Sequence, residues 1–187
     1  MKACILSGGK SSRLGEDKGL KLIQGKSLVA HLLNTLALLN VEVFIVANDE
    51  RYMAFGPPVV ADIISGKGPL GGTYTGLNIA GEDLLVLSVD TPFLSADNIH
   101  RVYQQHKSGR LTVAFFGEMM QPLLAVYPYL LKNKLATQLK TDRLKLMQFV
   151  EESGYDKISI ALTEIEQLNL NTPEDFVTAE KYFKYES

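Results

Sequence analysis

Cysteine and long apolar runs are scarce in this sequence of 187 residues. Its single cysteine cannot form an internal disulfide, so nothing points to an oxidising compartment. Apolar runs such as 84–87 are far too short to span a bilayer, and the N-terminus enters a strand-like run without a signal-peptide pattern. These absences predict a cytoplasmic protein that does not bind membranes.

An excess of charge is also lacking. The formal net charge is −2, which gives no general attraction to nucleic acid or to anionic membranes. Three scattered histidines and one cysteine argue against a zinc site. A hydrophobic fraction of 46% and a length of 187 residues predict one domain, residues 1–187, with an ordinary core.

Short apolar runs alternate with helix-like segments along the chain. Strands are predicted at 2–7, 41–47, 58–61, 84–89, 112–116 and 121–127. Helices are predicted at 27–40, 49–55, 69–80, 95–107, 129–139, 143–153 and 172–185, the first and fourth capped by serine. This alternation predicts an α/β fold, a Rossmann-like three-layer sandwich with helices on both faces of a mostly parallel sheet. The last two strands, joined across Gly117 and Glu118, would pair antiparallel and make the sheet mixed.

The segment LSGGKSSRLGEDKGLKL, residues 6–22, directly follows the first predicted strand. Gly8 and Gly9 let the backbone approach a ligand closely. Lys10, Arg13 and Lys18 add positive charge suited to a polyphosphate. The glycine spacing fits neither a Walker A loop nor a Gly-x-Gly-x-x-Gly fingerprint, so phosphates would be held in a different geometry.

Polar side chains also follow three other predicted strands. Asn48, Asp62 and Asp90 each come just after a strand, where ligands bind in open α/β sheets. An amide can bind a base or a ribose, and a carboxylate beside a triphosphate is a hard oxygen ligand for Mg²⁺. Each residue alone could be a turn residue, a helix cap or a solvated charge. Their coincidence favours a site for a magnesium-bound nucleotide.

The opening segment resembles the nucleotide-binding signature of the nucleotidyltransferases. Its Gly-Gly pair and its Asp-Lys-Gly-Leu sequence are most similar to the molybdenum cofactor guanylyltransferase family. Blocks that look like those of this family continue in the same order along nearly the whole chain: VANDE, GPLGGTYTGL, SVDTPFLS, QPLLAVYP, DRLKLMQFV and LNLNTPEDF. The resemblance implies a fold like that of the nucleotide-diphospho-sugar transferases.

The resemblance also implies roles for individual residues. It assigns GTP binding to Leu6, Ser7, Gly8, Gly9, Lys18, Asn48, Asp62 and Asp90. Leu6, Ser7 and Gly8 would line the guanine pocket with backbone groups. Arg13, Lys18 and Asp90 would be catalytic. Asp90 would hold Mg²⁺, and Asn171 would complete the metal site.

The implied second substrate is molybdopterin. Arg143 and Lys145 lie in the block that would approach the pterin phosphate. The resemblance also implies partner proteins that deliver or accept the cofactor. Ser7 replaces the usual alanine of the signature, and its hydroxyl near the base puts the nucleotide preference in doubt.

The implied reaction transfers GMP from GTP to molybdopterin and releases pyrophosphate. One alternative is a sister nucleotidyltransferase that uses CTP or another acceptor. The Gly8-Gly9 pair favours guanine, because relatives that prefer cytidine tend to carry Ala-Gly there. The other alternative is a non-catalytic nucleotide-binding module, which the presence of Arg13, Lys18 and Asp90 disfavours.

Overall fold

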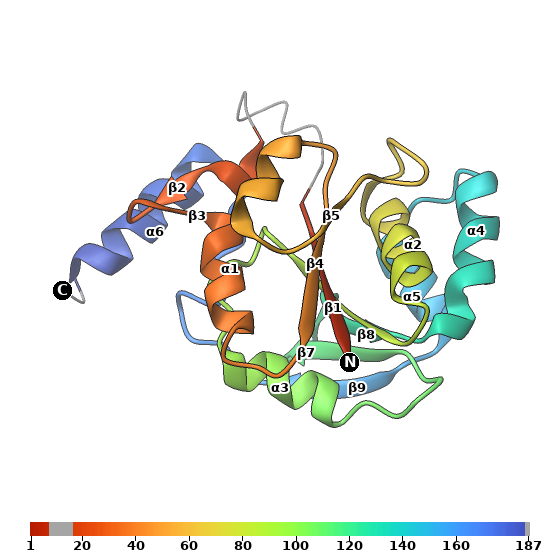
Figure 1. The fold of residues 1–187 in the computed structure, drawn as a ribbon. Coiled ribbons are helices and arrows are strands. Elements are labelled where there is room, and N and C mark those ends of the chain that lie inside the picture. The colour runs from red at the N-terminus through yellow and green to blue at the C-terminus, as the bar shows by residue number, and fades with distance from the viewer. Residues whose placement is uncertain (8–16, 186–187) are drawn as a thin grey trace.

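Seven strands form one mixed sheet in the order β5-β4-β1-β6-β8-β7-β9 in the computed structural model, which describes residues 1–7 and 17–185 (Figure 1). The strands are β1 (Lys2–Leu6), β4 (Glu42–Val46), β5 (Val59–Val60), β6 (Leu84–Ser88), β7 (Thr112–Phe116), β8 (Met119–Tyr127) and β9 (Asp156–Ile160). A separate small hairpin is made by β2 (Leu22–Ile23) and β3 (Lys26–Ser27).

The pairing confirms the expected mixed sheet. Strand β1 lies parallel to both β4 and β6, and β4 lies parallel to β5. Strand β8 runs antiparallel to its neighbours β6 and β7. Gly117, at φ 57°, and Glu118 link β7 to β8, as the sequence predicts.

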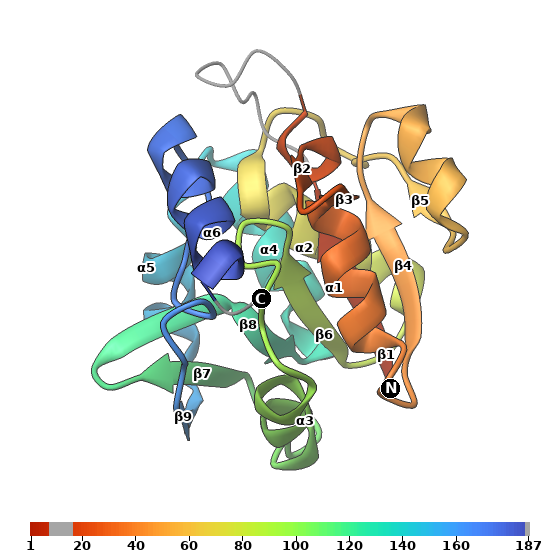
Figure 2. The same cartoon turned by 90° about the vertical axis from the view of Figure 1, so that its left-hand side faces the viewer.

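Helices cover both faces of the sheet and complete three layers (Figures 1 and 2). The α-helices are α1 (Leu28–Leu36), α2 (Gly68–Ala80), α3 (Ala96–Gln104), α4 (Lys132–Lys140), α5 (Leu146–Ser153) and α6 (Pro173–Tyr185). Three short 3₁₀ helices are η1 (Lys18–Leu20), η2 (Glu50–Phe55) and η3 (Tyr129–Leu131). Helices α1 and α3 pack on one face, and α2, α4 and α5 pack on the other.

Strand β1 shows why the central strands are apolar throughout. Ala3 and Ile5 point into the core under α1 and α3, whereas Cys4 and Leu6 point into the core under α2. Because both faces are covered, strict apolar–polar alternation is not needed. Cys4 is fully buried, and a Cβ added to Gly76 of α2 would lie 3.0 Å from its Sγ.

Several predicted helices are shorter than expected. Helix α1 ends at Leu36 instead of residue 40, and Leu38 and Leu39 instead donate to carbonyls three residues earlier. Helix α3 ends at Gln104 instead of residue 107. Helix α5 begins at Leu146 instead of residue 143, because Asp142 adopts φ 55° and turns the chain after α4.

Two elements were not expected from the sequence. Strand β9 pairs in parallel with β7 at the edge of the sheet, and only Ile158 and Ile160 of its five residues are buried. Two apolar positions are too few to separate a strand from a loop by periodicity. The strands of the β2–β3 hairpin are shorter still, with two residues each, of which Ile23 and Ser27 are buried.

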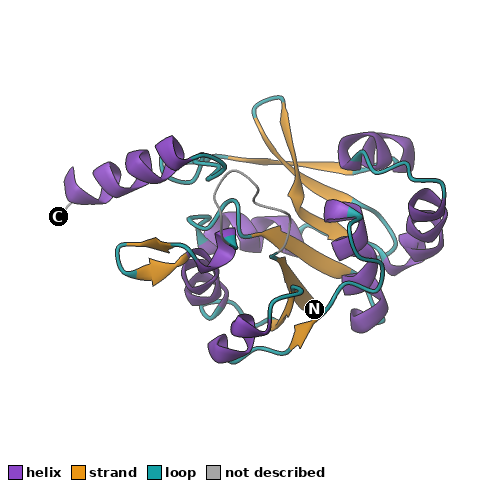
Figure 3. Cartoon of the chain, turned by 90° about the horizontal axis from the view of Figure 1, so that it is seen from above, coloured by secondary structure: helices purple, strands orange, loops and turns teal. Residues whose placement is uncertain are grey.

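A smaller core lies to one side of the sheet. Its buried residues are Ile23 of β2, Leu28 of α1, Ala179 of α6, and Leu170, which precedes α6. Figure 3 shows α6 extending outward from the rest of the molecule toward the C-terminus. Within the described residues, no helix is long and apolar enough to cross a membrane.

Candidate functional site

The carboxyl ends of β5, β4, β1 and β6 form one continuous edge. Three main-chain hydrogen bonds of 2.9 to 3.2 Å extend this edge just past the strands, from Ser7 to Val46, from Ala47 to Val60 and from Val89 to Leu6. Residues that follow these strands are therefore held in register. This is the edge at which the sequence predicts a ligand site.

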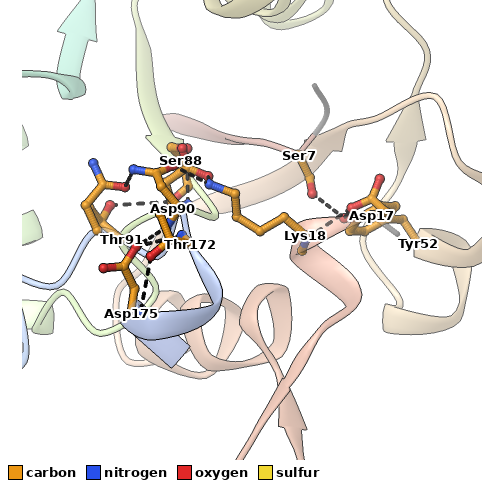
Figure 4. Close-up of polar contacts among 12 residues, drawn as sticks. Ser7, Asp17, Lys18, Tyr52, Ser88, Asp90, Thr91, Thr172 and Asp175 are labelled. Atoms are coloured by element: carbon orange, nitrogen blue, oxygen red, sulfur yellow. Dashed lines mark hydrogen bonds and ion pairs between the residues drawn. The ribbon is translucent and has the colours of Figure 1, made fainter. Parts of the chain in front are cut away.

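Lys18, Asp90 and Asn171 meet at this edge (Figure 4 labels the first two). The Lys18 Nζ lies 2.8 Å from Asp90 Oδ1 and donates to Asn171 Oδ1 at 2.6 Å. The Lys18 side chain is 13% exposed and that of Asp90 is 34% exposed. The structure thus brings together three residues that the sequence places far apart.

Asp90 is fixed by its own main chain. Its N–H donates to Ser88 Oγ at 3.2 Å, and its carbonyl accepts from the Leu170 N–H at 3.0 Å. The second bond ties the end of β6 to the segment that leads into α6. The Asp90 backbone therefore has a defined position, and its carboxylate pairs with Lys18.

Asn171 is held at the start of α6. Asp175 Oδ2 accepts from the N–H groups of Asn171 and Thr172, at 2.8 and 2.7 Å. Partial burial would raise the pKa of Asp175, but these donors outweigh it and lower that pKa. The Asn171 amide also donates to Asn169 Oδ1 at 2.8 Å, which turns its oxygen toward Lys18.

The donor set at this point suits a hard cation. A carboxylate oxygen of Asp90 and an amide oxygen of Asn171 already converge on the Lys18 ammonium. Over the described parts of the chain, no group of three or more His, Cys, Asp or Glu side chains could hold a metal. Mg²⁺ is commonly held by one or two protein carboxylates, with substrate phosphates and waters completing its shell. The residues present fit that arrangement.

Asn48 and Asp62 form a pair farther along the same edge. Asn48 Nδ2 donates to Asp62 Oδ2 at 3.0 Å, and the Asp62 N–H donates to Asn48 Oδ1 at 2.9 Å. The Asp62 Oδ1 is buried without a partner among the described residues. Burial raises the pKa of Asp62, while the Asn48 hydrogen bond opposes that rise. A buried polar atom is normally hydrogen-bonded, so this oxygen is an unused acceptor among the described residues.

Leu6 and Ser7 use part of their backbone in the sheet. The Leu6 carbonyl accepts from Val89, and the Ser7 N–H donates to Val46. The Ser7 hydroxyl is fully buried and donates to the hydroxyl of Tyr52, which in turn donates to Asp17 (Figure 4). Ser7 Oγ is therefore turned toward Tyr52.

A cavity of about 810 Å³ adjoins Asp90. Its walls come from the ends of β6 and β9, from β7 and β8, from α5, and from the segment before Asn169. Apolar side chains dominate it, including Phe115, Met119 and Met120. No lysine or arginine of the described residues lines it. Lys18, Asp90 and Asn171 are called the cation cluster below. Asp90 belongs to this cluster and also lines the cavity.

Other predicted site residues are placed differently. Arg143 is exposed and donates to Glu152 Oε1 at 2.6 Å, and Lys145 is the residue that precedes α5. Neither lines the cavity. Gly8, Gly9 and Arg13 lie outside the described residues, so their predicted roles stay predictions.

Glu166 is a buried carboxylate on the cavity wall that sequence reasoning did not single out. Its Oε1 accepts from Ser95 N and Asn98 Nδ2, both at 2.8 Å, and its Oε2 accepts from Thr163 N and Oγ1, at 3.0 and 2.9 Å. Burial alone would raise the pKa of Glu166, but these donors outweigh it and lower that pKa to about 2. Glu166 thus ties the start of α3 to the segment that leads to Asn169 and Asn171.

Glu166→Gln is expected to lower the free energy of unfolding at pH 7 by about 2 kcal/mol, allowing for solvent screening. The glutamine side chain would place its NH₂ group against N–H or O–H donors that now bond to a carboxylate oxygen of Glu166. Because the folded pKa lies below the ordinary value of 4.5, the stabilisation is complete above pH 4.5 and fades as the pH falls toward 2. Urea unfolding curves recorded at about every pH unit between pH 3 and pH 7 measure this loss of stability.

The matched control is Glu164→Gln, which changes an exposed glutamate two residues away. It should shift stability by less than about 0.5 kcal/mol at any of these pH values. A difference between the Glu166 variant and the unchanged chain that does not shrink on acidification would contradict the role given to the Glu166 carboxylate.

Tyr52 and Asp17 are further residues of this edge that the sequence did not identify. Tyr52 lies in a predicted helix, where an aromatic residue is most simply explained as core. Asp17 belongs to the motif, but nothing in the motif indicates its partner. The available signals were the Asp-Lys-Gly-Leu motif for Asp17 and, for Tyr52, a position five residues after the predicted strand 41–47.

Comparison with known proteins identifies the family of the chain. The model of the MobA-like NTP transferase domain matches residues 3–157. The chain is 31% identical to the molybdenum cofactor guanylyltransferase of Haemophilus influenzae, over 94% of this chain and 95% of that protein. It is 34% identical to the molybdenum cofactor guanylyltransferase of Yersinia pseudotuberculosis, over 91% of this chain and 90% of that protein.

A solved structure supports the fold. Molybdopterin-guanine dinucleotide biosynthesis protein A from Archaeoglobus fulgidus matches with a TM-score of 0.81 at 22% identity, over 99% of this chain and 100% of that chain. At this identity the match concerns architecture alone. The family match covers most of the chain, including β1, β6 and the edge between them. The chain therefore belongs to the MobA-like NTP transferase family and is a nucleotidyltransferase.

Proposed function

We propose that this chain transfers the guanylyl group of GTP to molybdopterin and releases pyrophosphate. Two relatives more than 30% identical carry the name molybdenum cofactor guanylyltransferase. The observation that carries the proposal is the position of Asp90, which belongs both to the cation cluster and to the wall of a large cavity. One substrate can then lie along the sheet edge and the other in the cavity.

The nucleotide would lie across the ends of β5, β4, β1 and β6. Asp62 and Asp90 are separated by three inter-strand steps, roughly 14 Å at about 4.8 Å each, the scale of a nucleoside triphosphate. The Asn48–Asp62 pair, with its unpaired Oδ1, would contact the nucleoside. Leu6 and Ser7 would border the base with the backbone groups that the sheet leaves available. Lys18 would contact the phosphates.

The acceptor would occupy the cavity. Its apolar walls, including Phe115 and Met120, suit the face of a flat ring. Because no described lysine or arginine lines the cavity, the acceptor's phosphate would be attracted by the Lys18 ammonium, which lies beside Asp90 at one end of the cavity. The roles predicted for Arg143 and Lys145 toward that phosphate stay predictions.

In the reaction, an oxygen of the acceptor phosphate forms a bond to the α-phosphorus of GTP. The bond from that phosphorus to the bridging oxygen breaks, and pyrophosphate leaves with the electron pair. The nucleophile is already an anion, so no general base is required. Lys18 would offset charge that develops on the bridging oxygen, and the fixed edge would align the two substrates.

Enzymes that transfer nucleotidyl groups generally need a divalent metal, and we propose Mg²⁺ for this one. Asp90 and Asn171 would hold it with their side-chain oxygens. The bound ion would supply further positive charge to the reacting phosphates. We also take residues 1–187 as one nucleotidyltransferase domain, because the small core joins α6 to α1 and β2.

Pyrophosphate release with GTP, CTP, ATP or UTP, each with molybdopterin, tests this function. We expect release with GTP and at least about 100-fold slower release with CTP. Omission of molybdopterin and removal of divalent ions are the controls, and both should abolish release. Release with CTP alone would reject the guanylyl assignment. Tight GTP binding without any release would indicate a non-catalytic module.

A further inference from the structure

We propose that Tyr52 is a positioning residue for Lys18 and acts through Asp17. This inference rests on the proposed function for its kinetic readout, and it adds a residue to the machinery. Tyr52 lies in η2, next to the sheet edge along which we place the nucleotide, and its side chain is 0% exposed. Any influence on a substrate must therefore pass through the groups that it contacts.

Three separate parts of the chain meet at the Tyr52 hydroxyl. It accepts a hydrogen bond from Ser7 at the end of β1 and donates one to Asp17, which precedes η1 (Figure 4). Burial raises the pKa of Tyr52, and the bond to Asp17 adds to that rise, so the hydroxyl keeps its proton and stays a donor. Removing the hydroxyl would disconnect β1, η2 and η1 at one point.

Both neighbours of Lys18 are fixed by this group. On one side, Asp17 accepts from Tyr52 and also from the Gly19 N–H, at 3.0 Å. On the other side, Gly19 packs so tightly that a Cβ there would overlap Tyr52 Oη and Ser7 Oγ. Glycine is needed here for close approach, since a side chain would force the contact apart.

The Lys18 backbone is thus held from both sides, and its ammonium reaches Asp90 and Asn171 from that position. A lysine side chain has many rotamers. A fixed Lys18 backbone therefore reduces the range of positions that its ammonium can adopt away from Asp90 and Asn171. Tyr52 contributes to that position without touching the ammonium. This is the behaviour of a supporting group that preorganises a charged side chain.

Tyr52→Phe is the direct test. We expect kcat to fall about 30-fold while the KM for the nucleotide changes less than about twofold, because misplacement affects the transition state most. The melting temperature should also fall, because the Ser7 hydroxyl loses its acceptor in a buried place. An unchanged kcat would overturn the proposal.

The double variant Ser7→Ala/Tyr52→Phe separates positioning from stability. Removing both hydroxyls leaves no buried hydroxyl unpaired, so the melting temperature should recover part of its loss. The link to Asp17 is still missing, so kcat should stay low. Recovery of kcat together with the melting temperature would show a merely structural role.

Tyr129→Phe is the matched control. Its hydroxyl accepts from Lys132 at 2.6 Å, and it lies beside Asp83 at the opposite edge of the sheet. This variant should keep kcat. Kinetics are measured with whichever nucleotide the unchanged protein uses. An error in the GTP assignment would therefore not be mistaken for an error in the role of Tyr52.

An NMR measurement needs no turnover. The resonance of the Lys18 ε-methylene group should move toward that of an exposed lysine in Tyr52→Phe and in the double variant, but not in Tyr129→Phe. An unmoved resonance in the double variant would overturn the proposal even if the protein turned over no nucleotide.

Discussion

Asp90→Asn is expected to lower pyrophosphate release by about 1000-fold, because the variant removes the negative charge that would hold the metal. Asparagine keeps the size and one oxygen of the side chain, so it can still accept from Lys18. The support of residue 90 is main-chain and does not change. The melting temperature should therefore stay within a few degrees, roughly the effect of a 1 kcal/mol change.

The measurement is turnover as a function of Mg²⁺ concentration, together with calorimetric binding of Mg²⁺ in the presence of a non-hydrolysable nucleotide. The control is Asp97→Asn, which changes an exposed aspartate in the first turn of α3. It should leave turnover and metal dependence unchanged. If Asp90→Asn kept turnover within about tenfold with an unaltered metal requirement, the metal would have to lie elsewhere.

Lys18→Met is expected to lower kcat by about 300-fold. Methionine is close to lysine in length but uncharged, so the charge on the leaving pyrophosphate would lose a partner. The oxygens of Asp90 and Asn171 would also lose the donor that they now share. Steady-state kinetics and a melting curve measure the two effects separately. Lys26→Met, at an exposed position of β3, is the control and should retain activity.

The two changes should also be less than additive. Lys18 and Asp90 lie 2.8 Å apart and would act on the same phosphates, so the double variant should lose much less than the product of the single losses. Full additivity would mean that the two residues act independently, which would contradict a shared role of the cluster in the reaction.

The position of the site followed from local signals in the sequence. Apolar runs such as that of β6 predict buried strands, and parallel strands end at a common edge. Asn48, Asp62 and Asp90 could therefore be predicted to share that edge without knowledge of any long-range contact. The structure agrees, and it adds that Asn48 and Asp62 bond to each other.

The supporting residues could not be predicted in this way. Glu166 is fixed by donors on α3 and on its own segment, so its role depends on how two distant parts pack. Tyr52 meets Asp17 across 35 positions of sequence. Such pairings depend on tertiary packing, which neither periodicity nor a motif encodes. Strand β9 was missed for the related reason that an edge strand needs only one neighbour and few buried side chains.

The contact between Lys18 and Asn171 joins positions 153 residues apart. During synthesis on the ribosome the strands β1, β4, β5 and β6 of the sheet edge are all translated long before Asn171. The asparagine that completes the cluster emerges only after β9. A nascent chain therefore lacks the finished cluster until nearly all of these residues have been translated.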